Sequence, residues 1–179
     1  MTLSFSENLD GKQTLFVQKI WNSILMDPGL IDQAKLFWQY RHAHYKKFST
    51  HWNIAAEGLW PKLHTIRKDE KNRWRAGKII HPIINNRSKK RFQFAPEMPV
   101  RKTQNIAILD LGIETRVEID GEHFDSWFHD PNFNCSGNRI TELAKNDGFP
   151  DAWSFLKYFN FDYEGKIIHW TGLEYKPFK

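Results

Sequence analysis

The chain has 179 residues, of which 40% are apolar, enough for one domain with additions or for two very small ones. Its single cysteine, Cys135, excludes a disulfide framework within one chain. No apolar run approaches a membrane span, and residues 1–12 lack the features of a secretory signal, so we expect a cytoplasmic protein that does not insert into a membrane. The net charge is +5, but residues 62–102 hold thirteen Lys and Arg against three acids, a concentration typical of a surface that binds phosphates.

Two helices are predicted in the N-terminal third of the chain. Apolar side chains recur at steps of three and four from Phe16 to Leu25, and the Asp-Pro-Gly sequence at 27–29 ends this pattern. The same spacing predicts a second amphipathic helix over residues 30–46. We therefore expect residues 1–61 to form a helical extension that packs on the rest of the protein.

Short strands are predicted after Pro61, because apolar and polar residues begin to alternate. The helical period then returns over 138–145 and after Pro150, before a closing strand at 166–170. Mostly antiparallel strands enclosed by few helices indicate an α+β fold, a small β-barrel over residues 62–179 with flanking short helices. The predicted strands before the helices are 62–67, 78–84, 91–94, 104–111 and 113–119.

Four segments in this order together resemble the ASCH domain, a family of PUA-like β-barrels. They are the strand KLHTIR at 62–67, the turn RWRAGKII at 73–80, the segment ending in NDGF at 146–149, and the strand IIHW at 167–170. The sequence GKQT at 11–14 also resembles the opening of many such domains. Lys12 and Lys62 are thus both candidates for the family's lysine, and Lys62 is preferred because TIR follows it at the family's spacing.

The resemblance implies a protein that handles nucleic acid, with a cleft that receives RNA or a modified base. Some family members resemble N4-acetylcytidine amidohydrolases, which use a lysine, a threonine and an acid. Carried over by position, these are Lys62, Thr65 and Asp147. Other members are discussed as ribonucleases or as RNA binders without catalysis.

The chemistry of that set is amide hydrolysis without a metal or any other cofactor. A lysine whose pKa is lowered by burial would take the proton of the Thr65 hydroxyl, which would attack an amide carbonyl while Asp147 orients the proton. Residues three apart on a strand point to opposite faces, so Lys62 and Thr65 converge only if a bulge or the strand's start lies between them. The alternative is structural, with Lys62 in solvent, Thr65 packed in a strand and Asp147 at a helix end.

The basic block supplies the candidate contacts to nucleic acid, because Arg and Lys side chains match phosphate oxygens. Trp74 lies between two arginines, and its ring either stacks on a base or anchors the turn in the core. The role in the core is favoured. The basic hairpin tip at 87–91 either reaches a nucleic-acid backbone or only solubilises the loop. The candidates are Arg67, Arg73, Trp74, Arg75, Lys78, Arg87, Lys89, Lys90 and Arg91.

Three functions follow from this sequence. The leading one is binding of nucleic acid, RNA in preference to DNA, with a modified or flipped base recognised in the cleft. The second is the amidohydrolase that uses Lys62, Thr65 and Asp147. The third is a protein-interaction module that uses exposed aromatic residues. A metal site is not expected at His42 and His44, because side chains two apart on a helix point about 200° apart.

Overall fold

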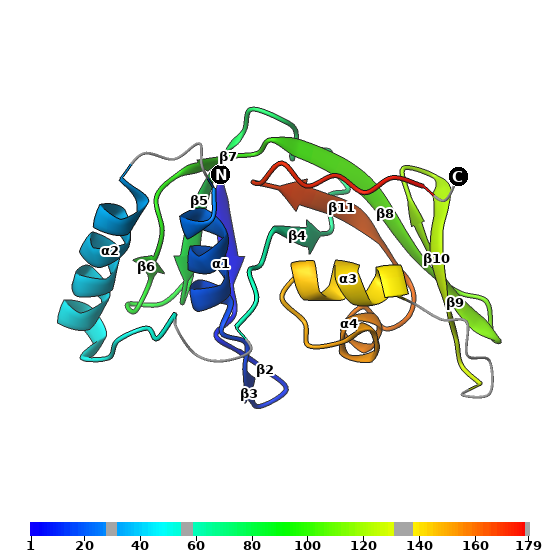
Figure 1. Ribbon diagram of the computed structural model, residues 1–179, viewed down its shortest axis with the longest axis horizontal. Coiled ribbons are helices and arrows are strands. Elements are labelled where there is room, and N and C mark those ends of the chain that lie inside the picture. Colours follow the sequence, from blue (N-terminus) through cyan, green and yellow to red (C-terminus); the bar gives the residue numbers. More distant parts are fainter. Residues whose placement is uncertain (28–31, 55–58, 131–137, 178–179) are drawn as a thin grey trace.

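The computed structural model describes residues 1–27, 32–54, 59–130 and 138–177, so Cys135 lies outside the described residues. The fold is α+β, as the sequence predicts, with two helices in the first third of the chain, two in the last third, and strands before, between and after them (Figure 1). The four helices of the described ranges are α1 (Phe16–Leu25), α2 (Gln33–Phe48), α3 (Asn138–Asn146) and α4 (Ala152–Tyr158). None of them is long and apolar enough to cross a membrane.

The larger sheet has five antiparallel strands, and the last strand of the chain lies in its interior. Its spatial order is β10, β9, β8, β11, β4. β10 lies beyond the strands that the sequence predicts. The strands are β4 (His64–Arg67), β8 (Lys102–Asp110), β9 (Glu114–Ile119), β10 (Glu122–Phe128) and β11 (Tyr163–His169).

The smaller sheet is built around β5 (Ile79–Ile84), which pairs in parallel with the N-terminal strand β1 (Thr2–Phe5). The short strands β6 (Phe92–Gln93) and β7 (Met98–Pro99) pair with β5 in the antiparallel direction. The sequence predicts no strand at the N-terminus, yet β1 alternates strictly between exposed and buried side chains. Residues 1–61 thus contribute a strand to this sheet as well as two helices.

The expectation of a barrel is corrected by this topology. Within the described residues the sheets remain open and no closed barrel forms, and a separate two-stranded hairpin joins β2 (Asn8–Leu9) to β3 (Lys12–Gln13). Local alternation in a sequence predicts strands but does not state which strands pair, so closure is decided by contacts between distant segments.

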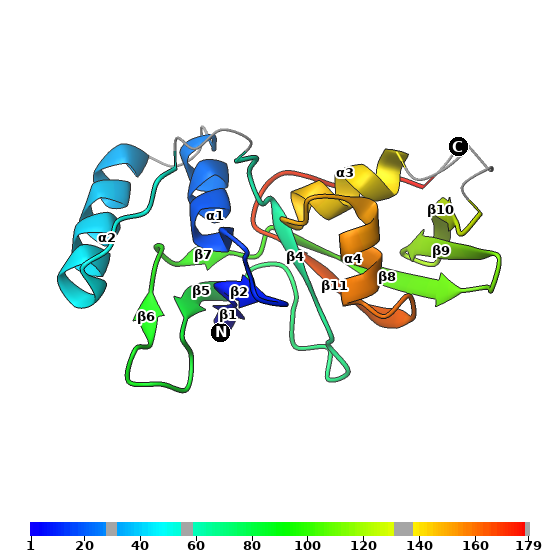
Figure 2. The same ribbon diagram turned by 90° about the horizontal axis from the view of Figure 1, so that it is seen from below.

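Two hydrophobic cores meet at β11, because its side chains alternate between the two faces of the larger sheet. Ile168 packs with α1, β1 and β5, whereas Ile167 packs with α3 and α4. Figure 2 shows α3 and α4 over the larger sheet and α1 over the smaller one. The loop before β4 and the end of α3 lie where these two halves meet, and the buried polar residues gather there.

Candidate functional site

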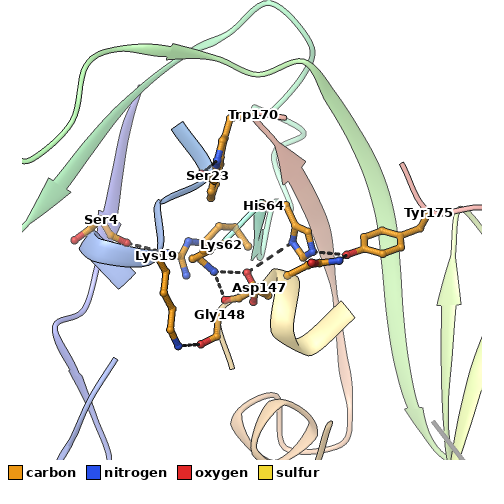
Figure 3. Close-up of polar contacts among 11 residues, drawn as sticks. Ser4, Lys19, Ser23, Lys62, His64, Asp147, Gly148, Trp170 and Tyr175 are labelled. Atoms are coloured by element: carbon orange, nitrogen blue, oxygen red, sulfur yellow. Dashed lines mark hydrogen bonds and ion pairs between the residues drawn. The ribbon is translucent and has the colours of Figure 1, made fainter. Parts of the chain in front are cut away.

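Lys62 and Asp147 form a buried ion pair between the two halves of the molecule. The two residues are only 1% and 3% exposed, and Lys62 Nζ lies 2.5 Å from Asp147 Oδ1. Nζ also donates a hydrogen bond to the backbone carbonyl of Asp147. Figure 3 shows the lysine side chain aimed at this carboxylate. Two of the three residues that the sequence assigns to catalysis are therefore brought together across 85 positions of chain.

Backbone contacts hold the two partners of this pair in place. The amide of Lys62 donates to the carbonyl of Lys19 in α1, and the amide of Leu63 donates to the carbonyl of Asn146 at the end of α3. Asp147 follows that helix, and Gly148 then turns the chain with a φ of +90°. A β-carbon at Gly148 would lie 2.8 Å from the ring of Phe16, so the turn is close-packed as well as left-handed.

His64 and Tyr175 extend the polar cluster beyond the ion pair. The Tyr175 hydroxyl accepts a hydrogen bond from Asn146 Nδ2 at 2.9 Å and lies within hydrogen-bond distance, at 2.8 Å, of His64 Nε2. The other ring nitrogen, His64 Nδ1, lies 3.8 Å from Asp147 Oδ1 and makes no hydrogen bond among the described residues. The resulting chain of groups runs from Tyr175 through His64 and Asp147 to Lys62 (Figure 3).

Burial sets the protonation of this cluster. It lowers the pKa of Lys62 to about 8 and raises the pKa of Asp147, and the attraction between the two groups opposes both shifts. Burial also lowers the pKa of His64 well below its usual value, so this ring is neutral at physiological pH. Lys19, whose ammonium donates to the carbonyl of Gly148 at 2.7 Å, has a pKa lowered to about 8 for the same reason.

Thr65 lies on the other side of the strand from His64. Thr65 is opposite Ile168 of β11 and is 2% exposed, so it faces the core that contains α1, β1 and β5. His64 lies on the opposite face of the strand, near Asp147. Among the hydrogen bonds of the described residues, none joins Thr65 to Lys62 or Asp147. The structure therefore assembles Lys62, Asp147 and His64, and Thr65 does not share their hydrogen bonds.

The basic block of the sequence is divided between two places in the fold. Residues 67–78 precede β5 and residues 87–91 follow it, and a strand of six residues spans roughly 20 Å. The second group lies against α2, because Lys47 Nζ donates to the carbonyl of Arg91 at 2.8 Å. The block thus forms two surfaces rather than the single one that its continuity in sequence indicates.

Several residues of the first group are occupied by contacts within the protein. Arg67 donates to the carbonyl of Ser4 at 2.8 Å and lies over the ring of Phe5. Trp74 is 4% exposed and belongs to the core that contains α1, β1 and β5. The structure therefore shows the core role for Trp74 and not a stacking surface. Arg73 lies 3.9 Å from Asp69, Arg75 is exposed and Lys78 is half-buried.

A polar hollow of about 460 Å³ borders the second basic group, which is the exposed hairpin tip with Arg87, Lys89, Lys90 and Arg91. Its walls are the β2–β3 hairpin, the start of α1, the end of α2 with residues 50–52, and the β5–β6 tip. Carboxamide, hydroxyl and aromatic groups dominate the lining, and Lys90 is the one Lys or Arg on it. The exposed ring of His51 at the edge of the hollow stacks on the ring of Tyr45, with 4.2 Å between the ring centroids and an angle of 5° between the ring planes.

Exposed aromatic side chains, which a protein-interaction module needs, are distributed over distant helices. Trp38 on α2 is 59% exposed and Trp153 on α4 is 53% exposed. Figure 1 shows α2 at one end of the molecule beside the smaller sheet, whereas α4 lies beside the larger sheet. Trp38 is also covered on one face by the guanidinium of Arg41 at 4.9 Å.

Reasoning from sequence misses several members of the buried cluster. His64 had a local signal, because it alternates with Thr65 and shares the face of Ile66. In the sequence, Lys19 is indistinguishable from any polar residue of an amphipathic helix. Tyr175 lies 111 positions from its partner His64, and no sequence signal predicts their contact.

Comparison of the chain with family models, with curated proteins and with solved structures finds no match. The ASCH resemblance therefore remains a prediction that depends on the four short segments alone. The geometry of the described residues carries the functional argument.

Proposed function

We propose that this protein binds single-stranded nucleic acid, RNA in preference to DNA, along the surface formed by the β5–β6 tip and the end of α2. The observation that carries the proposal is the polar hollow beside that tip, with exposed Arg and Lys residues on its border. Phosphates are attracted to the cations, and an unpaired base has a polar and aromatic recess to enter.

The charge around the hollow favours this surface over a second hollow, which lies beside the turn after β4. Four basic residues at the tip and Lys46 and Lys47 at the end of α2 face outward, whereas Glu7 is the one acid that lines the hollow. The second hollow, of about 330 Å³, is lined by Asp69, Glu70 and Glu164 together with two lysines. Such a mixed lining attracts phosphate weakly, because the two signs cancel at short range.

Salt dependence is the direct test of the phosphate contacts. We expect the affinity for a single-stranded RNA of about 20 nucleotides to fall steeply between roughly 50 and 200 mM salt, because bound cations on RNA are released on binding. Replacing the four basic residues of the tip by Gln should lower the slope of log K against log salt by about 3, at about 0.7 per lost contact. The same titration with DNA of equal sequence measures the preference for the 2′-hydroxyl.

A matched control comes from the other end of β5. The segment before β5 also offers two lysines and two arginines at Lys71, Arg73, Arg75 and Lys78, and their replacement by Gln changes the net charge equally. We expect this variant to keep most of the salt slope. Equal losses in both variants would show a diffuse electrostatic attraction instead of a defined surface, and the proposal would then fail.

The Lys62–Asp147 pair favours a second candidate, hydrolysis of an amide on an acylated nucleoside. A buried amine with a pKa of about 8 is a competent base near neutral pH, and its carboxylate partner is 2.5 Å away. Because His64 takes the place beside Asp147 that the sequence suggests for Thr65, a water would be the nucleophile in this site. Lys62 accepts the proton of that water as its oxygen attacks the carbonyl carbon, and the amine leaves with a proton returned from Lys62.

Acetate release from N4-acetylcytidine tests this candidate. Activity should be lost in Lys62→Met and kept in Thr65→Val, with native circular dichroism in both variants. Loss in both variants would favour the set in which Thr65 is the nucleophile, and no release by the wild-type protein would remove the candidate.

A further inference from the structure

We propose that the polar hollow is the entrance to the buried Lys62–Asp147 pair, and that the ring of Phe16 is the gate that separates them. Phe16 is the first residue of α1 and lines the hollow. The same ring lies 4.7 Å from Lys62 Nζ, with the ammonium over it. One side chain therefore contacts both the open site and the closed one.

The ring of Phe16 is packed against the core on one side and lines the hollow on another. Gly148 has no side chain there, and a β-carbon would approach the ring to 2.8 Å and the Lys62 side chain to 3.2 Å. Phe5 and Phe149 meet the ring at 6.5 and 6.3 Å on the side of the core. Because the hollow is open space that the ring already borders, the proposed gate opens by a turn of the ring toward the hollow.

The backbone at the start of α1 is strained at Leu15, although Thr14 before it is held by hydrogen bonds to the carbonyls of Glu7 and Ser6. Leu15 precedes the helix with a φ of +56°. This left-handed conformation is unfavourable for any residue that has a β-carbon, and the leucine side chain donates or accepts no capping hydrogen bond. The amide of Phe16 donates a long hydrogen bond, of 3.3 Å, to the Thr14 hydroxyl. Relief of the strain at Leu15 offsets part of the cost of moving the first turn.

The open site would accept a small neutral molecule with donors and acceptors on its edge. The carboxamides of Gln13, Gln18 and Asn85 line the hollow, and the ammonium and carboxylate of the buried pair would form its inner end once the gate is open. This inference depends on the proposed function only for the identity of the ligand, because a base of bound RNA would enter the hollow. The connection between hollow and pair is independent of it.

Trace acetylation measures whether Lys62 is reached through the gate. Unprotonated Lys62 attacks acetic anhydride, acetate leaves and the nitrogen loses its proton to solvent, and peptide masses report the extent at each lysine. At pH 8 we expect at least tenfold faster acetylation of Lys62 in Phe16→Ala than in wild type, and an intermediate rate in Phe16→Leu, which keeps the apolar contact if the alanine variant folds poorly.

Phe155→Ala is the matched control, because Phe155 is fully buried, touches Phe149 and does not line the hollow. An equal rise at Lys62 in this variant would show general loosening, and an unchanged rate in both Phe16 variants would show that the hollow leads nowhere; either result overturns the gate. Single-stranded RNA should slow the labelling in Phe16→Ala. Labelling that rises without protection by RNA leaves the gate standing and counts against RNA as the occupant.

Discussion

Lys62 and Lys90 carry the same ammonium group in opposite settings, and the contrast separates two uses of charge in this protein. Lys62 is 1% exposed and bound to one carboxylate, whereas Lys90 is exposed at a hairpin tip beside a polar hollow. A buried charge acts through its partner and through the cost of leaving water. An exposed charge acts through its field, which salt screens within about 10 Å.

The largest expected effect breaks the buried side of this comparison. Lys62→Met leaves the Asp147 carboxylate without its partner, and we expect the free energy of unfolding to fall by about 3–5 kcal/mol in urea titrations. The double variant Lys62→Met/Asp147→Leu should recover much of this loss, because no charge then remains buried. A loss below about 1 kcal/mol in the single variant would show that water reaches the pair.

Gly148→Ala should lower the stability by about 2–4 kcal/mol, since the left-handed backbone and the crowded Phe16 ring both oppose a β-carbon. Gly112→Ala separates the two causes. Gly112 has a φ of +81°, close to that of Gly148, but its β-carbon would meet open space. We expect Gly112→Ala to cost only about 1–2 kcal/mol by thermal or urea unfolding. Equal costs would remove the packing argument at Gly148.

The pKa of Lys62 predicts a rise of stability with pH. The folded state holds this amine at about 8 and the ordinary value is 10.5, so between these pH values the unfolded chain binds more protons than the folded one. Stability should therefore increase by up to about 3 kcal/mol across this window. Lys19 contributes in the same direction. Lys62→Met should flatten the rise in urea titrations at pH 8, 9 and 10, and an unchanged slope would contradict the assignment.

The smallest expected change in stability concerns an exposed charge, that of Arg73. Arg73 is largely exposed and 3.9 Å from Asp69, so Arg73→Gln should change the stability by at most about 0.5 kcal/mol. The side chain of Asp69 is buried, and its carboxylate accepts hydrogen bonds from the amides of Arg73 and Trp74 at 2.9 and 2.8 Å. Asp69→Ala should cost about 2 kcal/mol in the same assay. Equal effects of the two changes would mean that the ion pair, and not the amide contacts, holds this turn.

The sequence predicts most elements of this fold, but not how they pair. The helices from Phe16 and from residue 138 follow from periodicity, and the strand at 79–84 lies within the predicted strand at 78–84. The short N-terminal strand does not, because its four residues are stabilised by a parallel partner about 80 positions away. The barrel prediction is wrong for the same reason, since closure depends on which edges meet.

For the candidate site, the family resemblance named Lys62 and Asp147, and only the fold showed that they touch. Alternation along the strand at 64–67 already set Thr65 and His64 on opposite faces, since successive side chains of a strand point apart. The sequence also determined a surplus of positive charge in residues 62–102. Tertiary structure decided the rest, because a six-residue strand carries the two halves of that charge to opposite ends, and distant chain segments bury one lysine and leave another beside a hollow.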